Sequence, residues 1–246
     1  MGTRRPLVVS LAAVAVVIGG AVVVDSISAS RVEADLSTRI RPATPGVSAP
    51  SVMVGGGPTG RWSGPDTLAS VSIRAEGVYR PGLGPVTVEA TATDLTVPDD
   101  RAADLLAGSV SVSVQITGDS LGPVLGMRDV VVGAADDPTL AGGTEDRARV
   151  TGTLEESGTR VSAIVHLVVD SRGAHLVPVA AATGPAGVPG QDPDLALRRT
   201  ALTLAPDVLP LGLAVDSLTA RGGTLTASGD GGPRTAPLGG LARPDL

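Results

Sequence analysis

The sequence predicts an α+β fold that is mostly antiparallel β, preceded by an N-terminal transmembrane helix. Three observations support this. Apolar and polar residues alternate with period two through much of 68–182, helical patterns are few and short, and an uncharged apolar run occupies 7–24. We divide the chain into a signal anchor (1–24), one domain (25–230) and a disordered tail rich in Gly, Pro and Arg (231–246).

The composition excludes several classes of function. The 246 residues carry a net charge of −6, with no Cys or Phe and with single Trp and Tyr residues. Without cysteine there is neither a disulfide nor a thiolate metal site. Without a basic patch, nucleic-acid binding has no support. We therefore expect no cofactor, no metal and no nucleic-acid partner.

Positive charge precedes the apolar run only. Arg4 and Arg5 lie before it, and Asp25 is the first charge after it. This pattern predicts a cytoplasmic N-terminus and a single-pass protein whose C-terminal domain lies on the extracytoplasmic side of the cell membrane. The small residues 28–30 would suit signal cleavage and secretion to the envelope. The run is longer than the roughly 7–15 residues of a signal h-region, which favours an uncleaved anchor.

The next elements are a helix and a short strand. Residues 25–40 place four aliphatic residues on one broad helical stripe, and Pro42 and Pro45 end the helix. Val52 and Val54 predict a strand that runs into a glycine-rich connection.

Alternation then defines the strands of the domain. Their inward-facing residues are Val71, Ile73 and Ala75; Val86, Val88, Ala90 and Ala92; and Val110, Val112, Val114 and Ile116. Pro81-Gly82 and Gly222-Gly223 are typical of tight turns.

The remaining segments are assigned from helix-capping residues, from Gly and Pro that end helices, and from the alternation of apolar and polar residues. Residues 99–107 predict a short helix that ends at Gly108, and 132–147 a polar loop. Strands follow at 148–154 and 161–170; the second is apolar on both faces, so we expect it at the centre of the sheet or covered on both faces. Asp192-Pro193 opens a helix that extends to Pro206, and 209–231 form a hairpin.

Three segments in this order resemble the actinobacterial LmeA-type phospholipid-binding proteins. They are a D-x(7)-E helix after the anchor, the motif formed by Pro50, Val52, Val54 and Gly56, and the terminal LPLGLAVDSLTARGGTLTASGDG. The resemblance implies a cell-envelope protein similar to the tubular lipid-binding superfamily. In that fold a curved antiparallel sheet wraps a long helix and encloses an apolar groove for acyl chains.

The resemblance makes the aliphatic strand faces candidates for the groove. These are Val71, Ile73, Val86, Val88, Val110, Val112, Val114, Ile116, Val165 and Leu167. The same residues would serve equally well as an ordinary core. Where many members carry an aromatic Pro-Phe-Leu stretch, this chain has GPTGRWSGPD. Trp62 is therefore either a membrane-interface residue or a core residue.

A catalytic alternative rests on Gly118-Asp119-Ser120-Leu121-Gly122, which matches both G-x-S-x-G and the GDSL signature. An elbow needs a helix after the strand, and Pro123 and Gly126 argue against one. An esterase would need a histidine as general base, and the sequence has only His166 and His175. We interpret the first as a strand residue and the second as a hairpin-turn residue. The acidic pairs, including Glu155-Glu156, lack EF-hand spacing and are interpreted as solvated turns.

We expect a non-enzymatic, membrane-anchored phospholipid-binding protein of the cell envelope that holds or shuttles acyl chains. Its partners would be phospholipid and the cytoplasmic membrane, with any protein partner unknown. The alternatives are an exported structural or interaction domain with a dry core, and a GDSL-like esterase that uses Ser120.

Overall fold

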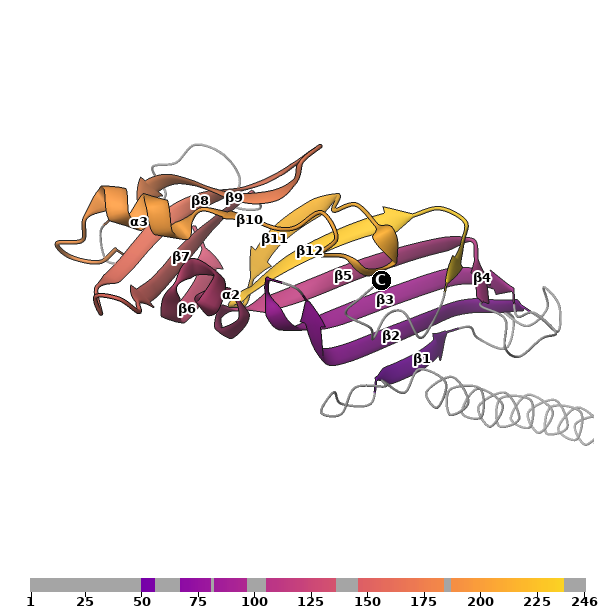
Figure 1. Ribbon diagram of the computed structural model, residues 1–246. Helices are drawn as coiled ribbons and strands as arrows, with labels where there is room; N and C mark the ends of the chain where they lie inside the picture. Colours follow the sequence, from indigo (N-terminus) through magenta and orange to yellow (C-terminus); the bar gives the residue numbers. More distant parts are fainter. Residues whose placement is uncertain are drawn as a thin grey trace, which may run out of the picture.

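The computed structural model describes residues 50–55, 67–80, 82–96, 105–135, 146–183 and 187–236. It confirms a mostly antiparallel β fold, arranged as two sheets that lie side by side along the long axis of the molecule (Figure 1). The predicted anchor, the helix at 25–40 and Trp62 lie outside the described residues. Among the described residues, no helix is long and apolar enough to cross a membrane.

Sheet A is curled into a half-barrel (Figure 1). Its strands are β1 (Ser51–Gly55), β2 (Thr67–Arg80), β3 (Gly84–Thr96), β4 (Leu105–Ala107), β5 (Ser109–Thr117), β11 (Ser217–Arg221), β12 (Thr224–Gly231) and β13 (Arg234–Ala236). The order is β1-β2-β3-β5-β12-β11, and β4 pairs with β3 and β13. The last strands of the described chain thus complete a sheet begun by the first.

Sheet B is formed by one continuous part of the chain. Its strands are β6 (Met127–Ala134), β7 (Arg147–Leu154), β8 (Arg160–Asp170), β9 (Gly173–Ala181) and β10 (Leu202–Thr203), in the order β10-β9-β8-β7-β6. The predicted strand at 161–170 is β8, and it is central as expected. Residues from Val161 to Val165 are buried without alternation, which confirms that β8 is covered on both faces.

Two predicted turns are confirmed by their backbone geometry. Gly222 and Gly223 have φ of 58° and 86° between β11 and β12, the positive values that a tight hairpin turn requires. Gly82 has φ of 76° between β2 and β3, and the amide of Leu83 donates to the carbonyl oxygen of Arg80 at 3.0 Å.

Each of the two described α-helices has eight residues. The first, α2 (Gly118–Leu125), follows β5 and packs against β6, so it carries the chain from sheet A to sheet B. The second, α3 (Pro193–Thr200), begins as predicted, because the side chain of Asp192 accepts from the amides of Asp194 and Leu195. It ends at Thr200, so its predicted extension to Pro206 is wrong.

The structure corrects three further assignments. Leu105–Ala107 form β4 rather than the end of a helix, and the rest of that predicted helix lies outside the described residues. Residues 132–134 belong to β6 rather than to a loop. Arg234–Ala236 form β13 in the predicted disordered tail; β13 pairs with β4, far away in the sequence.

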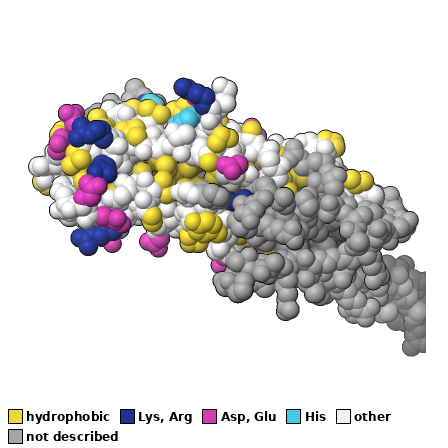
Figure 2. All heavy atoms as spheres, viewed as in Figure 1, with side chains coloured by type: hydrophobic (Ala, Val, Ile, Leu, Met, Phe, Trp, Pro, Cys, Tyr) yellow, Lys and Arg dark blue, Asp and Glu magenta, His cyan; other side chains and the backbone are white. Residues whose placement is uncertain are grey.

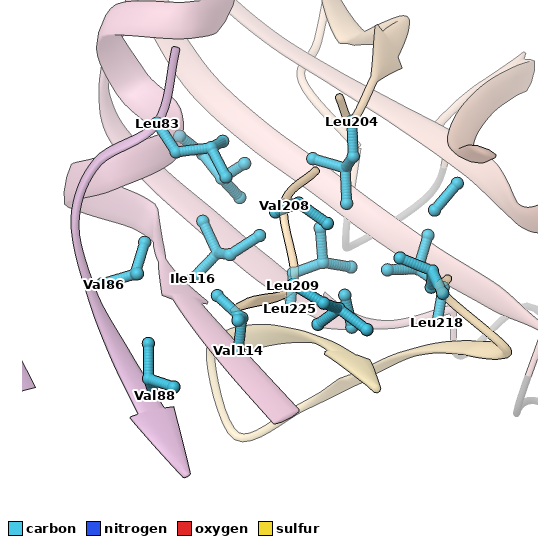
Figure 3. Close-up of a cluster of buried hydrophobic side chains, with 14 of the residues drawn as sticks. Leu83, Val86, Val88, Val114, Ile116, Leu204, Val208, Leu209, Leu218 and Leu225 are labelled. Atoms are coloured by element: carbon cyan, nitrogen blue, oxygen red, sulfur yellow. The ribbon is translucent and has the colours of Figure 1, made fainter. Parts of the chain in front are cut away.

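The segment between β10 and β11, residues 204–216, covers part of sheet A; we call it the covering segment. It includes the 3₁₀ helix η3 (Pro210–Gly212). Its buried aliphatic side chains are Leu204, Val208, Leu209, Leu213 and Val215. They pack into one apolar cluster with both sheets. Figure 3 shows Leu204, Val208 and Leu209 beside Ile116 and Leu225 of sheet A.

Candidate lipid-binding surface

The concave face of sheet A is a continuous aliphatic surface. One register row runs from Val52 of β1 through Ile73, Ala90 and Val112 to Gly229 of β12. Equivalent rows lie on each side of it because every second residue of these strands points inward. The inward side chains of β2 from Val71 to Val78, and those of β3 and β5, carry no hydrogen-bonding group.

Eight of the ten candidate residues lie on this face, as the alternation predicts. They are Val71, Ile73, Val86, Val88, Val110, Val112, Val114 and Ile116. The other two, Val165 and Leu167, lie on β8 of sheet B but belong to the same apolar cluster. None of the ten is more than 8% exposed. All ten are therefore buried side chains of the apolar cluster.

Side-chain size changes along the concave face. In the rows nearer β4 the inward residues of β3 are Ala90 and Ala92. In the rows nearer α2 the inward residues are larger: Val88 of β3 pairs with Val114, and Ile116 of β5 pairs with Leu225. The covering segment packs there (Figure 3). Small side chains leave more space between a sheet and whatever covers it, so the Ala-rich part is the better place for an added hydrocarbon chain.

The convex face of sheet A carries polar side chains that pair with one another. Hydroxyl groups pair across strands, as in Ser72 with Thr91 at 3.0 Å and Thr93 with Ser109 at 2.8 Å. The guanidinium group of Arg74 forms ion pairs with Glu76 and Glu89. These paired polar groups offer no apolar contact to a hydrocarbon chain.

One charged residue interrupts the aliphatic surface. Arg80 ends β2 on the same face as Val78, and only 2% of it is exposed. Among the described residues, its Nε and Nη2 have no hydrogen-bond partner. Burial lowers the pKa of Arg80, and the nearby carboxylate of Asp207 in the covering segment opposes that shift. Alternation gave no reason to single out this residue.

The GDSL segment forms a strand followed by a helix, so the expectation that Pro123 and Gly126 prevent a helix is wrong. Gly126 is instead the left-handed C-cap, with φ of 64°. The Ser120 hydroxyl is buried, and it donates to the carbonyl oxygen of Pro85 at 2.5 Å. This arrangement fastens α2 to β3 and leaves the hydroxyl facing a backbone acceptor.

The histidines lie in sheet B, away from Ser120. His166 is a partly buried residue of β8, as predicted. His175 lies within β9 rather than in the turn before it. Its Nε2 is 3.2 Å from Oδ1 of Asp170 and its Nδ1 is 3.1 Å from Oγ1 of Thr203. The predicted turn residues Glu155 and Glu156 are exposed, and Glu156 pairs with Arg199 at 2.8 Å.

Three hollows on the surface of the described residues contain none of the ten candidate side chains. They measure about 530 Å³ beside β6 and β7, about 690 Å³ around His175 and β10, and about 310 Å³ between the β2–β3 turn and α2. Figure 2 shows apolar side chains grouped near this last place. Tyr79 lines this hollow and is 59% exposed, with its side chain on the opposite face of β2 from Arg80.

A family model described as LmeA-like phospholipid-binding matches residues 23–230, which include sheet B and sheet A up to β12. The chain belongs to the LmeA-like phospholipid-binding family. Membership confirms the resemblance found in the sequence. Neither a search of curated proteins nor a search of solved structures found a match.

Proposed function

We propose that this LmeA-like protein binds phospholipid by holding its acyl chains against the concave face of sheet A. The observation that carries the proposal is the aliphatic surface that runs across β2, β3 and β5 in a chain of a phospholipid-binding family. Residues 7–24 would anchor the protein, with this domain on the outer side of the cytoplasmic membrane. There it would hold or shuttle lipid without catalysing a reaction.

The energetics favour an aliphatic ligand. Each buried methylene group contributes about 0.8 kcal/mol, so an acyl chain of ordinary length has ample driving force to leave water. The candidate side chains are all buried. Lipid entry therefore requires the chain that covers this face to move, and the covering segment is the described part best placed to do so.

A photoreactive phospholipid tests the location of the acyl chains. The full-length protein is purified in non-ionic detergent, loaded with a phospholipid that carries a diazirine near the end of one acyl chain, irradiated and mapped by mass spectrometry. We expect cross-links to β2, β3 and β5. Labelling confined to residues 7–24 would indicate a dry core and favour the structural-domain alternative.

A matched pair of variants sharpens this experiment. Ala90→Leu fills space on the concave face, whereas Thr91→Leu changes the neighbouring residue on the convex face. Ala90→Leu should reduce cross-linking severalfold, and Thr91→Leu should leave it unchanged. Thermal unfolding of both variants checks the fold, because overpacking a filled core costs about 1–3 kcal/mol. Equal cross-linking of the two variants would contradict the proposal.

A further inference from the structure

Arg80 occupies the end of an apolar stripe. On β2 the buried residues Val71, Ile73, Ala75 and Val78 lead directly to it, and its neighbour Tyr79 points to the opposite face. A one-residue change of register would have exposed the guanidinium group to water. The sequence instead directs this charge inward.

The guanidinium group has one complete edge available. Nε and Nη2 lie side by side and donate in parallel, which is how arginine binds a carboxylate or phosphate with two hydrogen bonds. Both atoms are buried, and neither has a partner in the described part of the chain. An unpaired buried charge is costly, so this edge is suited to an anionic group that arrives from outside the protein.

We propose that Arg80 binds the phosphate group of the phospholipid through its Nε–H and Nη2–H edge, while the acyl chains lie along the apolar stripe of β2. This inference rests on the proposed function and deepens it, since it assigns the polar end of the ligand to one residue.

The dimensions of the stripe suit this assignment. From Val71 to Arg80 an extended strand spans roughly 30 Å. One leaflet of a bilayer has a hydrocarbon layer of about 15 Å, half of the roughly 30 Å core. A phospholipid with its phosphate at Arg80 can therefore keep a whole acyl chain on the apolar stripe. Free phosphate would use the same two donors but gain nothing from the stripe.

Two lipids that differ only in the phosphate group test the inference. Binding of dioleoyl phosphatidic acid and of dioleoylglycerol to the full-length protein in non-ionic detergent is measured by native mass spectrometry. The wild type should prefer phosphatidic acid by tenfold or more. Arg80→Met should bind the two lipids equally, and Arg80→Lys, which keeps the charge without the paired donors, should have an intermediate preference. Arg74→Met is the control, because Arg74 lies exposed on the convex face.

The outcomes separate this inference from the proposed function. If the wild type binds neither lipid, the proposed function fails. If it binds both equally, or if Arg80→Met keeps the preference, lipid binding stands and the role of Arg80 is overturned. Inorganic phosphate that binds at Arg80 without competing with phosphatidic acid would also overturn it, because the site would then serve free phosphate.

A second measurement reads the response of the wild type itself and uses the conservative variant Arg80→Lys only to assign one signal. In a ¹⁵N spectrum, the Nε–H signal that is missing in Arg80→Lys belongs to Arg80. It should shift when phosphatidic acid is added and stay in place when dioleoylglycerol is added. The same shift with both lipids would contradict a phosphate contact.

Discussion

The hydroxyl group of Ser120 donates to the backbone carbonyl oxygen of Pro85 at 2.5 Å, which fastens the first turn of α2 to the start of β3. The two residues are distant in sequence, so this bond contributes to closing sheet A against the helix that leads to sheet B. It also engages the hydroxyl group that a GDSL esterase would need.

Ser120→Ala should destabilise the protein by about 1–2 kcal/mol and leave phospholipid binding unchanged. The carbonyl group of Pro85 would lose its partner in a partly buried place, and the loss of such a hydrogen bond carries that cost. Urea unfolding measures the difference, with the exposed Ser111→Ala as a control. An esterase activity of the wild type that disappears in Ser120→Ala would revive the catalytic alternative.

Gly229→Ala should destabilise the protein by about 2 kcal/mol or more. A Cβ atom at this position would lie 2.0 Å from the carbonyl oxygen of Ala214, so the covering segment would have to shift on β12. Gly232→Ala is the matched control, because a methyl group there would meet no described atom within 4 Å. Thermal unfolding that places both variants at the same midpoint would show that the covering segment is not packed this closely.

Asp170 should make the protein more stable above pH 4 than below it. The pKa of Asp170 is lowered, first by the hydrogen bond from the amide of Arg172 and then by those from the side chains of His175 and Arg172. A lowered pKa in the folded state means that the stabilisation is present above the ordinary pKa of about 3.9 and is lost as the pH falls through the folded value.

The comparison for this prediction is Asp170→Asn. The loss of unfolding midpoint between pH 6 and pH 3 should be smaller in this variant than in the wild type. The difference will be modest, since solvent reaches the carboxylate and screens its interactions. Identical pH profiles would remove Asp170 as a source of acid sensitivity.

Asp207→Asn should strengthen the binding of phosphatidic acid by roughly two- to fivefold. The Asp207 carboxylate acts on Arg80, so it would repel a phosphate group at the same place. An interaction of this kind at a surface amounts to about 0.5–1 kcal/mol. Binding of dioleoylglycerol should not change. Weaker binding of phosphatidic acid in this variant would mean that Asp207 supports the site rather than competing for it.

The alternation of apolar and polar residues was sufficient to predict the strands that have one polar face. Val110, Val112, Val114 and Ile116 lie on the concave face because Ser111, Ser113 and Gln115 need water or a polar neighbour. The same reasoning predicted the central position of β8 in its sheet. These are local properties, and each strand carries them in its own residues.

Two kinds of strand could not be predicted from local alternation: a strand that depends on a distant partner, and a strand that contains proline. β4 is a strand because Leu105–Ala107 pair with Arg234–Ala236, a partner that no local pattern reveals. β9 contains Pro178, which is tolerated where the register shifts between Ile164 and Val165. The inward orientation of the Arg80 side chain was not predicted, because a buried charge is rare and only the register of β2 and β3 shows which way this side chain points.

The insertion of sheet B between the two parts of sheet A has a consequence for biosynthesis. Residues 127–203 contain every strand of sheet B, so that unit can form as soon as it has been translated. The half-barrel must wait for β11 and β12, because β12 pairs with β5 across the whole intervening sequence. A nascent chain therefore carries an incomplete apolar sheet surface until β12 has been translated. Any chaperone that binds the nascent chain would therefore be needed by strands β1 to β5 rather than by β11 and β12.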